Sequence, residues 1–280
     1  MKVIADPQLF REQSRKWRTA KKSIGFVPTM GALHEGHLDL VRACRKNNDF
    51  TVVSIYVNPL QFGPKEDFSK YPRTLEKDLE SLKSEKVHAV FTPSDKEMYP
   101  EGFSTAVEVK GPLVAGLCAP FRPGHFNGVA TVVVKLLGAV APDRLYLGQK
   151  DAQQVAVLKR VIRDLNIGVE TVVCPTVREH DGLAMSSRNQ RLTLEGRKIA
   201  PVLYKALKVG KSIVELGETK TEKVLEEISK VIGDERTVKI QYLEAVNAET
   251  LAPVKEIKPG TMIALAAYLD NVRLIDNIII

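Results

Sequence analysis

The spacing of apolar positions changes along the chain in a way that separates strands from helices. Short apolar runs predict buried strands at Ile24–Val27, Thr51–Val57, Val87–Phe91, Arg144–Leu147 and Val169–Val173. Between them, apolar residues recur three and four positions apart within residues 37–44, 75–82 and 155–165, which predicts amphipathic helices. Strands that alternate with such helices predict an α/β fold with a parallel sheet covered on both faces. Ligands of such a sheet bind beyond the carboxyl ends of its strands.

The pattern changes after about Val177. Helical periodicity is continuous over Thr193–Leu216 and Thr219–Ile232. Strands are predicted at Val238–Val246, Thr261–Ala267 and Val272–Ile280, with few helices between them. We therefore expect a first domain of residues 1–177 and a smaller α+β domain of residues 178–280.

The composition excludes several classes of protein. Among 280 residues, 44% are hydrophobic and 27% charged, which is typical of a globular protein and not of a disordered one. No apolar run approaches the roughly 18 residues of a membrane helix, and residues 1–22 lack the apolar centre of a secretory signal. The three cysteines are widely spaced, so we expect neither a zinc site nor a disulfide framework. This cysteine usage predicts a cytoplasmic location.

The charge balance favours anionic ligands. Lysine plus arginine exceed aspartate plus glutamate by 41 − 34 = 7. Basic residues form no block of the kind that marks a nucleic-acid-binding tail, and aromatic residues make up only 6%. A nucleotide or another phosphate-bearing substrate accounts for the excess, and we expect no nucleic-acid and no membrane partner.

The segment PTMGALHEGH, residues 28–37, joins the first strong strand to a helix. A helix start presents unpaired N–H groups and a partial positive charge, which suits a phosphate. Gly31 has no Cβ and lets the backbone approach a nucleotide closely. His34 and His37 lie on one side of the first helical turn, where their imidazoles can stabilise charge that develops on phosphate oxygens. A zinc-protease motif is excluded, because its histidines are four residues apart and not three.

Two further segments carry groups suited to phosphates. In DGLAMSSRN, residues 181–189, the hydroxyls of Ser186 and Ser187 and the guanidinium of Arg188 can follow a departing pyrophosphate. In GQKDAQQ, residues 148–154, Lys150 can reach a phosphate as a point charge. Asp151 can cap the helix that follows, which is its simpler interpretation, and Gln154 can point back at a ligand from one turn into that helix.

A loop at the end of the second strong strand carries candidate residues for binding a carboxylic acid and a metal ion. Gln61, in VNPLQF, is an uncharged donor that can hold a nucleophilic carboxylate without neutralising it. Asp78, a few residues after YPRT, is a candidate Mg²⁺ ligand, since magnesium favours one or two carboxylates together with phosphate oxygens. The alternative is that Asp78 is an ordinary solvated helix residue.

These segments together resemble a known family. PTMGALHEGH, YVNPLQF, YPRT, RPGHFNGVATVVVKL, GQKDAQQ and REHDGLAMSSRN occur in this order and spacing in the pantothenate synthetases, which carry the HxGH motif of the nucleotidylyltransferase superfamily. The resemblance runs from about Ile24 to Asn189. It implies a Rossmann-like, doubly wound first domain, a smaller lid domain and a homodimer. It also implies that ATP, with Mg²⁺, activates pantoate as an adenylate that β-alanine then attacks.

The resemblance also implies roles for individual residues. His34, His37, Lys150, Ser186, Ser187 and Arg188 would contact the ATP phosphates, with His34, His37 and Lys150 catalytic. The rest of the ATP site would be formed by Met30, Gly31, Gly148, Asp151, Val177 and Met185. Gln61, Gln154 and Asn58 would bind pantoate and β-alanine, and Asp78 would hold the metal. Residues 122–134 would lie near the active site and the dimer contact.

Small departures and one rival remain. Leu137-Gly138 stands where the family commonly has Phe-Asn, and Gly63-Pro64-Lys65 stands where many members carry Asn or Asp. The rival is a nucleotidylyltransferase of the same superfamily that transfers a nucleotide to a phosphate substrate and stops there. The glutamines Gln61 and Gln154 favour a carboxylate substrate instead.

Overall fold

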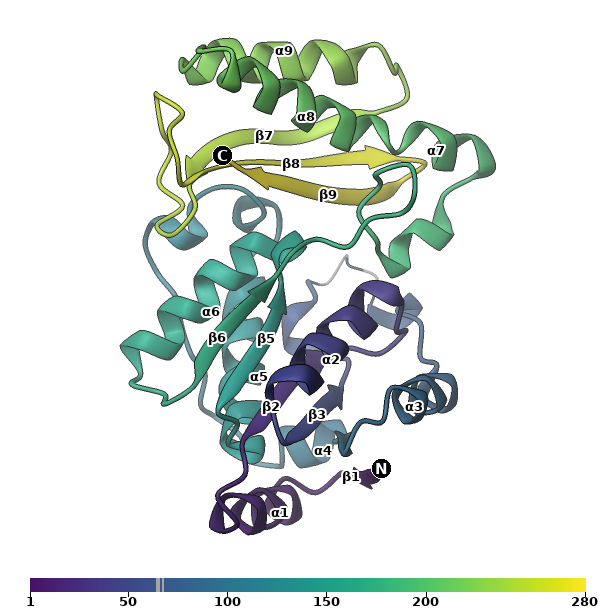
Figure 1. The fold of residues 1–280 in the computed structure, drawn as a ribbon, viewed down its shortest axis with the longest axis vertical. Helices are drawn as coiled ribbons and strands as arrows, with labels where there is room; N and C mark the ends of the chain where they lie inside the picture. Colours follow the sequence, from purple (N-terminus) through teal and green to yellow (C-terminus); the bar gives the residue numbers. More distant parts are fainter. Residues whose placement is uncertain (64–65, 67) are drawn as a thin grey trace. The chain divides into compact units, whose positions relative to one another are not determined.

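The computed structural model describes residues 1–63, 66 and 68–280 (Figure 1). Pro64 and Lys65, part of the loop in which the sequence departs from its family, lie outside the described residues. The chain divides into two compact units. The first contains residues 1–109, 122–149 and 157–175, and the second contains residues 110–121, 150–156 and 176–280. The domains predicted at 1–177 and 178–280 stay a prediction.

The first unit is built on a parallel sheet. Its strands, in the described part of the chain, are β1 (Lys2–Ile4), β2 (Ile24–Thr29), β3 (Phe50–Ile55), β4 (Ala89–Phe91), β5 (Arg144–Gly148) and β6 (Glu170–Cys174). They lie in the order β1-β4-β3-β2-β5-β6, and every pair is parallel. The predicted parallel α/β fold is confirmed. The edge strand β1 was not predicted, because three residues are too few to show a periodicity.

Helices cover both faces of this sheet. They are α1 (Pro7–Thr19), α2 (Glu35–Asn47), α3 (Leu75–Ser84), α4 (Asp95–Met98), α5 (His125–Val140) and, from Val157 onward, α6 (Ala152–Asp164). Val90 of β4 packs in one cluster with Val41 of α2 and Leu82 of α3. The next residue, Phe91, contacts Phe10 of α1 on the opposite face, with ring centroids 5.1 Å apart. This alternation is the reason why β4 is apolar throughout.

The order of the strands locates the ligand edge. The chain runs outward from β2 to β3 and β4, then returns through α5 to place β5 on the other side of β2. Strand order therefore reverses between β2 and β5, and parallel α/β sheets bind ligands at such a point. The carboxyl ends there are Thr29 and Gly148.

The second unit contains an antiparallel sheet, as predicted. Its described strands are β7 (Lys239–Asn247), β8 (Thr261–Leu269) and β9 (Val272–Ile279), in that order. They share a core with the helices α7 (Leu194–Ile199), α8 (Val202–Glu215) and α9 (Thr221–Gly233). The continuous helix predicted over Thr193–Leu216 was wrong in one respect: it breaks near Pro201, whose ring removes a backbone donor.

Within the described residues, no helix combines the length and the apolar character that crossing a membrane requires. The thiols of Cys44, Cys118 and Cys174 are all buried and unpaired in disulfides. Burial raises the pKa of the Cys44 thiol to about 12, which keeps it protonated and unreactive.

Candidate functional site

The turn from β2 into α2 places two imidazoles side by side at a helix start. His34 is the N-cap of α2, and its Nδ1 accepts a hydrogen bond from the N–H of Gly36 at 3.1 Å. The Nδ1 of His37 accepts from the N–H of His34 at 3.4 Å, and the two rings lie 4.1 Å apart. Because each Nδ1 accepts a hydrogen bond, each ring carries its proton on Nε2. Two Nε2–H donors at the N-terminus of a helix suit a phosphate.

The Asp78 carboxylate is engaged by this same turn. Its Oδ2 accepts from the N–H of Ala32 and its Oδ1 from the N–H of Leu33, both at 2.9 Å. The hydroxyl of Thr74 donates to Oδ2 at 3.2 Å. No group of three metal-binding side chains occurs among the described residues. Three protein donors already bond to the two carboxylate oxygens and magnesium would have to compete with them, so the arrangement suits a direct magnesium ligand poorly.

A pair of buried amides lies beyond the end of β3, at the short 3₁₀ helix η1 (Pro59–Gln61). Asn58 is 1% exposed; its Nδ2 donates to the Oε1 of Gln61 and to the carbonyl of Gly128, both at 3.1 Å. Its Oδ1 accepts from the hydroxyl of Tyr99 at 2.7 Å and from a backbone N–H. All four hydrogen-bonding positions of the Asn58 amide are therefore used within the protein, and one of these bonds orients Gln61. The Nε2 of Gln61 contacts the Sδ of Met30 at 3.0 Å, and its second amide N–H bonds to none of the described residues, so it can serve a ligand.

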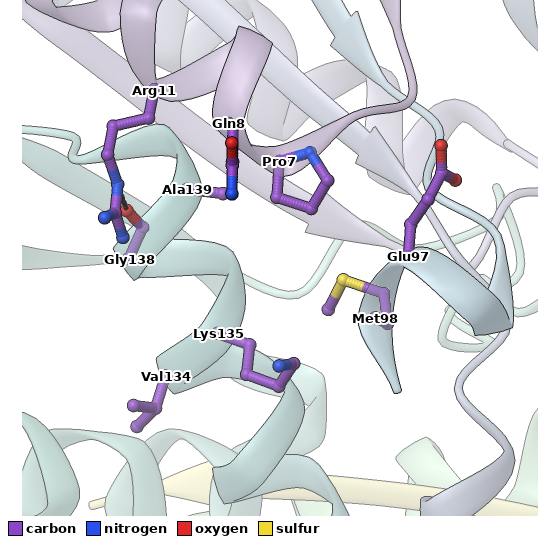
Figure 2. A pocket seen from close by; sticks show the side chains of 9 residues that line it. All are labelled: Pro7, Gln8, Arg11, Glu97, Met98, Val134, Lys135, Gly138 and Ala139. Atoms are coloured by element: carbon purple, nitrogen blue, oxygen red, sulfur yellow. Dashed lines mark hydrogen bonds between the residues drawn. The ribbon is translucent and has the colours of Figure 1, made fainter. Parts of the chain in front are cut away.

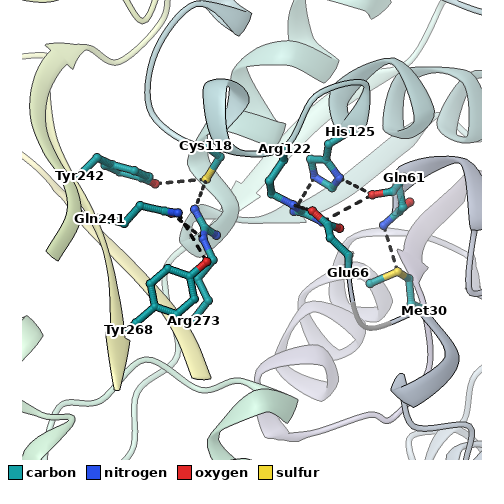
Figure 3. A network of polar contacts seen from close by, with 10 residues as sticks. All are labelled: Met30, Gln61, Glu66, Cys118, Arg122, His125, Gln241, Tyr242, Tyr268 and Arg273. Atoms are coloured by element: carbon teal, nitrogen blue, oxygen red, sulfur yellow. Dashed lines mark hydrogen bonds and ion pairs between the residues drawn. The ribbon is translucent and has the colours of Figure 1, made fainter. Parts of the chain in front are cut away.

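A chain of polar groups holds the backbone of Gln61 in place (Figure 3). The Nε and Nη2 of Arg122 each donate to Glu66 at 2.7 Å. Another nitrogen of Arg122 lies 2.9 Å from the Nε2 of His125, whose Nδ1 lies 2.7 Å from the carbonyl oxygen of Gln61. Since arginine can only donate, His125 accepts at Nε2 and donates from Nδ1 to Gln61.

The carboxylate of Glu66 completes this chain. Burial acts to raise the pKa of Glu66, but the hydrogen bonds and charge of Arg122 outweigh it and leave the pKa below its ordinary value. The ionised pair is therefore present at neutral pH. The sequence placed residues 122–134 near the site but assigned no role to Arg122, His125 or Glu66.

A cavity of about 300 Å³ lies at the carboxyl ends of β2, β3 and β4. Met30, Gly31 and Asp78 are among the residues that line it, with Arg73 as a cation at its wall. A larger hollow of about 430 Å³ lies between α1, α4 and α5, and is lined by Arg11, Glu97 and Lys135 among others (Figure 2). Of the residues expected near the site, this second hollow is lined only by Val134, the last residue of the stretch 122–134, to which no individual role was given.

In the second unit, the predicted residues 150–154 follow the end of β5. Lys150 is half-buried, its Nζ lies 3.8 Å from the carboxylate of Asp151, and its carbonyl accepts from Asn277 at 3.0 Å. Gln154 is half-buried one turn into α6. Gln153 is used structurally, because its amide binds the backbone of residues 113, 116 and 118.

The second predicted loop folds as a tight turn in the same unit. Met185 donates from its N–H to the carbonyl of Val177 at 3.0 Å, which pairs two residues predicted to line the nucleotide site. The hydroxyl of Ser186 accepts from the N–H of Arg188 at 3.3 Å and begins the 3₁₀ helix η6 (Ser187–Arg191). Ser187 and Arg188 therefore occupy the first turn of that helix.

A buried ion pair that the sequence did not reveal supports this loop. Arg178 makes two bonds to the carboxylate of Asp276, at 2.6 and 3.0 Å, and stacks 3.5 Å from the ring centre of Tyr204. Burial raises the pKa of Asp276, and the charge of Arg178 opposes that shift. Arg178 also donates to the carbonyl of Gly182, so the pair holds the turn before Met185.

Another polar cluster of the second unit surrounds Cys118 (Figure 3). Its Sγ lies 3.2 Å from the hydroxyl of Tyr242 and 3.2 Å from a nitrogen of Arg273. Burial raises the pKa of the Tyr242 hydroxyl, which therefore stays protonated. The predicted site residues take no part in this cluster.

The fold and the β2–α2 turn are those of an α/β enzyme of the class that binds its ligands at the carboxyl edge of a parallel sheet. Within the first unit that edge presents paired histidines and a buried amide. The chain belongs to the pantoate–β-alanine ligase family, whose sequence model matches residues 2–279. The predicted family is confirmed.

Relatives of known name agree along the whole length. The pantothenate synthetase of Thermotoga petrophila is 52% identical over 280 residues, 100% of both chains. The crystal structure of pantothenate synthetase from Thermus thermophilus has a TM-score of 0.93 at 45% identity and covers 99% of each chain. A pantoate–β-alanine ligase from Francisella tularensis, in complex with β-γ ATP and β-alanine, has a TM-score of 0.82 at 36% identity, covering 100% of this chain and 97% of that one.

Proposed function

We propose that this chain condenses pantoate with β-alanine to pantothenate, using ATP and forming a pantoyl adenylate. Membership of the ligase family supports the overall reaction. The observation that supports a carboxylic acid as the substrate is the buried, uncharged amide of Gln61, which Asn58 holds at the end of β3. A neutral donor orients a carboxylate without lowering its nucleophilicity as a paired cation would.

The first half-reaction joins the acid to the nucleotide. A carboxylate oxygen of pantoate attacks the α-phosphorus of ATP, a C–O–P link forms, and the bond to the β-phosphate breaks to release pyrophosphate. The Nε2–H groups of His34 and His37 donate to phosphate oxygens as charge grows on them. Lys150, Ser186, Ser187 and Arg188 are proposed as the remaining phosphate contacts. Met30, Gly31, Gly148, Asp151, Val177 and Met185 are proposed as the rest of the ATP site.

The second half-reaction forms the amide. The amine of β-alanine attacks the acyl carbon of the adenylate, the C–N bond forms, the C–O bond to AMP breaks, and the amine releases its proton. Gln61 and Gln154 are proposed to bind pantoate in both steps, with Asn58 orienting Gln61. Magnesium is proposed as the ion that accompanies the ATP phosphates, where it would offset their charge.

Product analysis tests the reaction. The protein is incubated with ATP, magnesium and pantoate, with and without β-alanine, and AMP, pyrophosphate and pantothenate are measured. We expect pyrophosphate release that requires pantoate, and pantothenate with AMP only when β-alanine is added. Nucleotide transfer to a phosphate acceptor, with no dependence on pantoate, would refute the proposal.

Lys150 separates the two half-reactions. Lys150→Ala should stop pyrophosphate release from ATP while leaving amide formation from supplied pantoyl adenylate near normal, because only the first step involves the β- and γ-phosphates. Equal loss in both steps would assign Lys150 a structural role.

Assembly and location are proposed from the family resemblance. We propose a homodimer, which light scattering of the purified chain tests by its mass. We also propose a cytoplasmic location, consistent with three unpaired cysteines. Fractionation of cells that express the chain checks this.

A further inference from the structure

The turn that follows β2 adopts an uncommon backbone conformation. Gly31 has φ of 82° and Ala32 has φ of 50°, so two consecutive residues are left-handed. Glycine accepts this conformation without strain, whereas the Cβ of Ala32 is crowded by its own backbone. Something outside the turn must therefore hold Ala32 in place.

The Asp78 carboxylate lies where it can hold Ala32 in this conformation. The N–H groups of Ala32 and Leu33 point at its two oxygens, each at 2.9 Å. Successive backbone N–H groups of a turn form a cradle for an anion, and here the anion is a side chain from α3. The contact spans 46 residues of sequence, so it joins two otherwise separate segments of the first unit.

Among the described residues, neutral donors alone hold Asp78. It is 2% exposed, and no lysine, arginine or histidine of the described residues forms an ion pair with it. Thr74 donates a further bond, and Asp78 lies in the first turn of α3, where a negative charge is favoured. A buried carboxylate is costly unless its hydrogen bonds are satisfied, and these bonds satisfy it from the side of the turn.

The held residues lead directly into the two histidines. Leu33 precedes His34, the N-cap of α2, and His34 and His37 bond to each other through the capping arrangement. A shift of Ala32 and Leu33 would therefore move both imidazoles relative to the end of β2.

We propose that Asp78 is a positioning residue that locks the β2–α2 turn so that His34 and His37 meet the ATP phosphates, and that it does not bind magnesium. The proposal rests on the proposed function, because its readout is adenylate formation.

Asp78→Asn tests the proposal. The amide keeps the size but puts an N–H₂ group against one of the two backbone N–H donors, which pushes the turn away. We expect kcat for pantoate-dependent pyrophosphate release to fall about 10²-fold, the scale of a 1 Å misplacement. The magnesium concentration that gives half-maximal rate should stay within about twofold of the wild-type value, since no ligand has been removed. A rate restored by excess magnesium would overturn the proposal.

A second substitution checks that the turn is what Asp78 acts on. Ala32→Gly removes the crowded Cβ, so the turn holds its conformation with less help. In the Asp78→Asn background it should raise kcat about fivefold or more, given the 1–2 kcal/mol that a left-handed residue with a Cβ costs. No gain in the double variant would also count against the proposal. Glu76→Gln, an exposed carboxylate in the same turn of α3, is the matched control and should change neither kcat nor the magnesium dependence.

Thr74→Val is a milder variant in case Asp78→Asn does not fold. It removes only the hydroxyl that donates to Oδ2 at 3.2 Å. It should lower kcat by a smaller factor, again with unchanged magnesium dependence, and a raised magnesium requirement would refute the positioning role. The wild-type chain in the same assay tests the function separately, because a wild type that releases no pyrophosphate with pantoate refutes the reaction and not the role of Asp78.

Discussion

Gly128 is where helix α5 meets the loop that carries Gln61, and we predict that Gly128→Ala disables the acid site. A Cβ at this position would overlap the carbonyl group of Leu60 and would lie 2.7 Å from the backbone nitrogen of Gln61. Unlike a flexible side-chain end, these backbone atoms cannot rotate away. The same glycine also accepts a bond from Asn58 through its carbonyl.

The magnitude follows from that overlap. Ordinary contact of a Cβ begins at about 3.4 Å, so the loop must move by at least 3.4 − 2.7 = 0.7 Å at Gln61 and by more at Leu60. Overpacking costs about 1–3 kcal/mol, and alanine regains about 1 kcal/mol of helix propensity over glycine. We therefore expect a net loss of about 0–2 kcal/mol in the free energy of unfolding. A shift near 1 Å should lower kcat/KM for pantoate about 10²-fold.

The assay measures pyrophosphate release against pantoate concentration, ATP affinity by calorimetry, and thermal unfolding. ATP affinity should change little, because the new Cβ overlaps atoms of Leu60 and Gln61 and none of the β2–α2 turn. Gly138→Ala on the same helix is the control: its Cβ would meet only the flexible end of Arg11, at 3.5 Å. It should keep normal pantoate kinetics. Normal pantoate kinetics in Gly128→Ala as well would refute the argument that close packing of α5 positions Gln61.

Three further predictions concern side chains. His37→Ala should lower turnover about 10²–10³-fold, the scale of losing one donor to developing charge, and near-normal turnover would remove its catalytic role. Gln61→Glu should abolish pantoate use while sparing ATP affinity, since like charges about 4 Å apart cost roughly 4 kcal/mol at an effective dielectric near 20; unchanged pantoate kinetics would contradict this. Because the pKa of Glu66 is lowered below its ordinary 4.5, its pair with Arg122 stabilises the fold above that pH and is lost as the pH falls through the lower folded value. The midpoint temperature of thermal unfolding, measured from about pH 7 to pH 3, should therefore fall more steeply for the wild type than for Glu66→Gln. Parallel pH curves for the two proteins would show that the ion pair does not stabilise the fold.

The site residues that the sequence predicts come from short segments, because the signals for them are local. The apolar run before Pro28, the glycine of the turn and the histidines three residues apart all lie within one stretch of chain. The period of side chains separates strand from helix there, and a helix start determines which backbone groups face a ligand. The second sheet was predicted for the same reason.

Residues that support the site could not be found this way, because their partners are distant in sequence. The sequence left Asp78 as a metal ligand or a solvated helix residue, and only its contacts with Ala32 and Leu33, 46 and 45 positions earlier, point to a carboxylate that holds a turn. The need for glycine at position 128 arises from the close packing of α5 against Leu60, which is distant in sequence.

The sequence by itself determined the family and the alternation of strands and helices along most of the chain, and it named candidate groups for the phosphates, since periodicity and motif chemistry are properties of neighbouring residues. Only the tertiary structure decided which groups hold those residues in place. Arg122 reaches Glu66 across 56 positions and His125 reaches Gln61 across 64. Burial and hydrogen bonding arise when such distant segments pack together, and no local pattern encodes that packing.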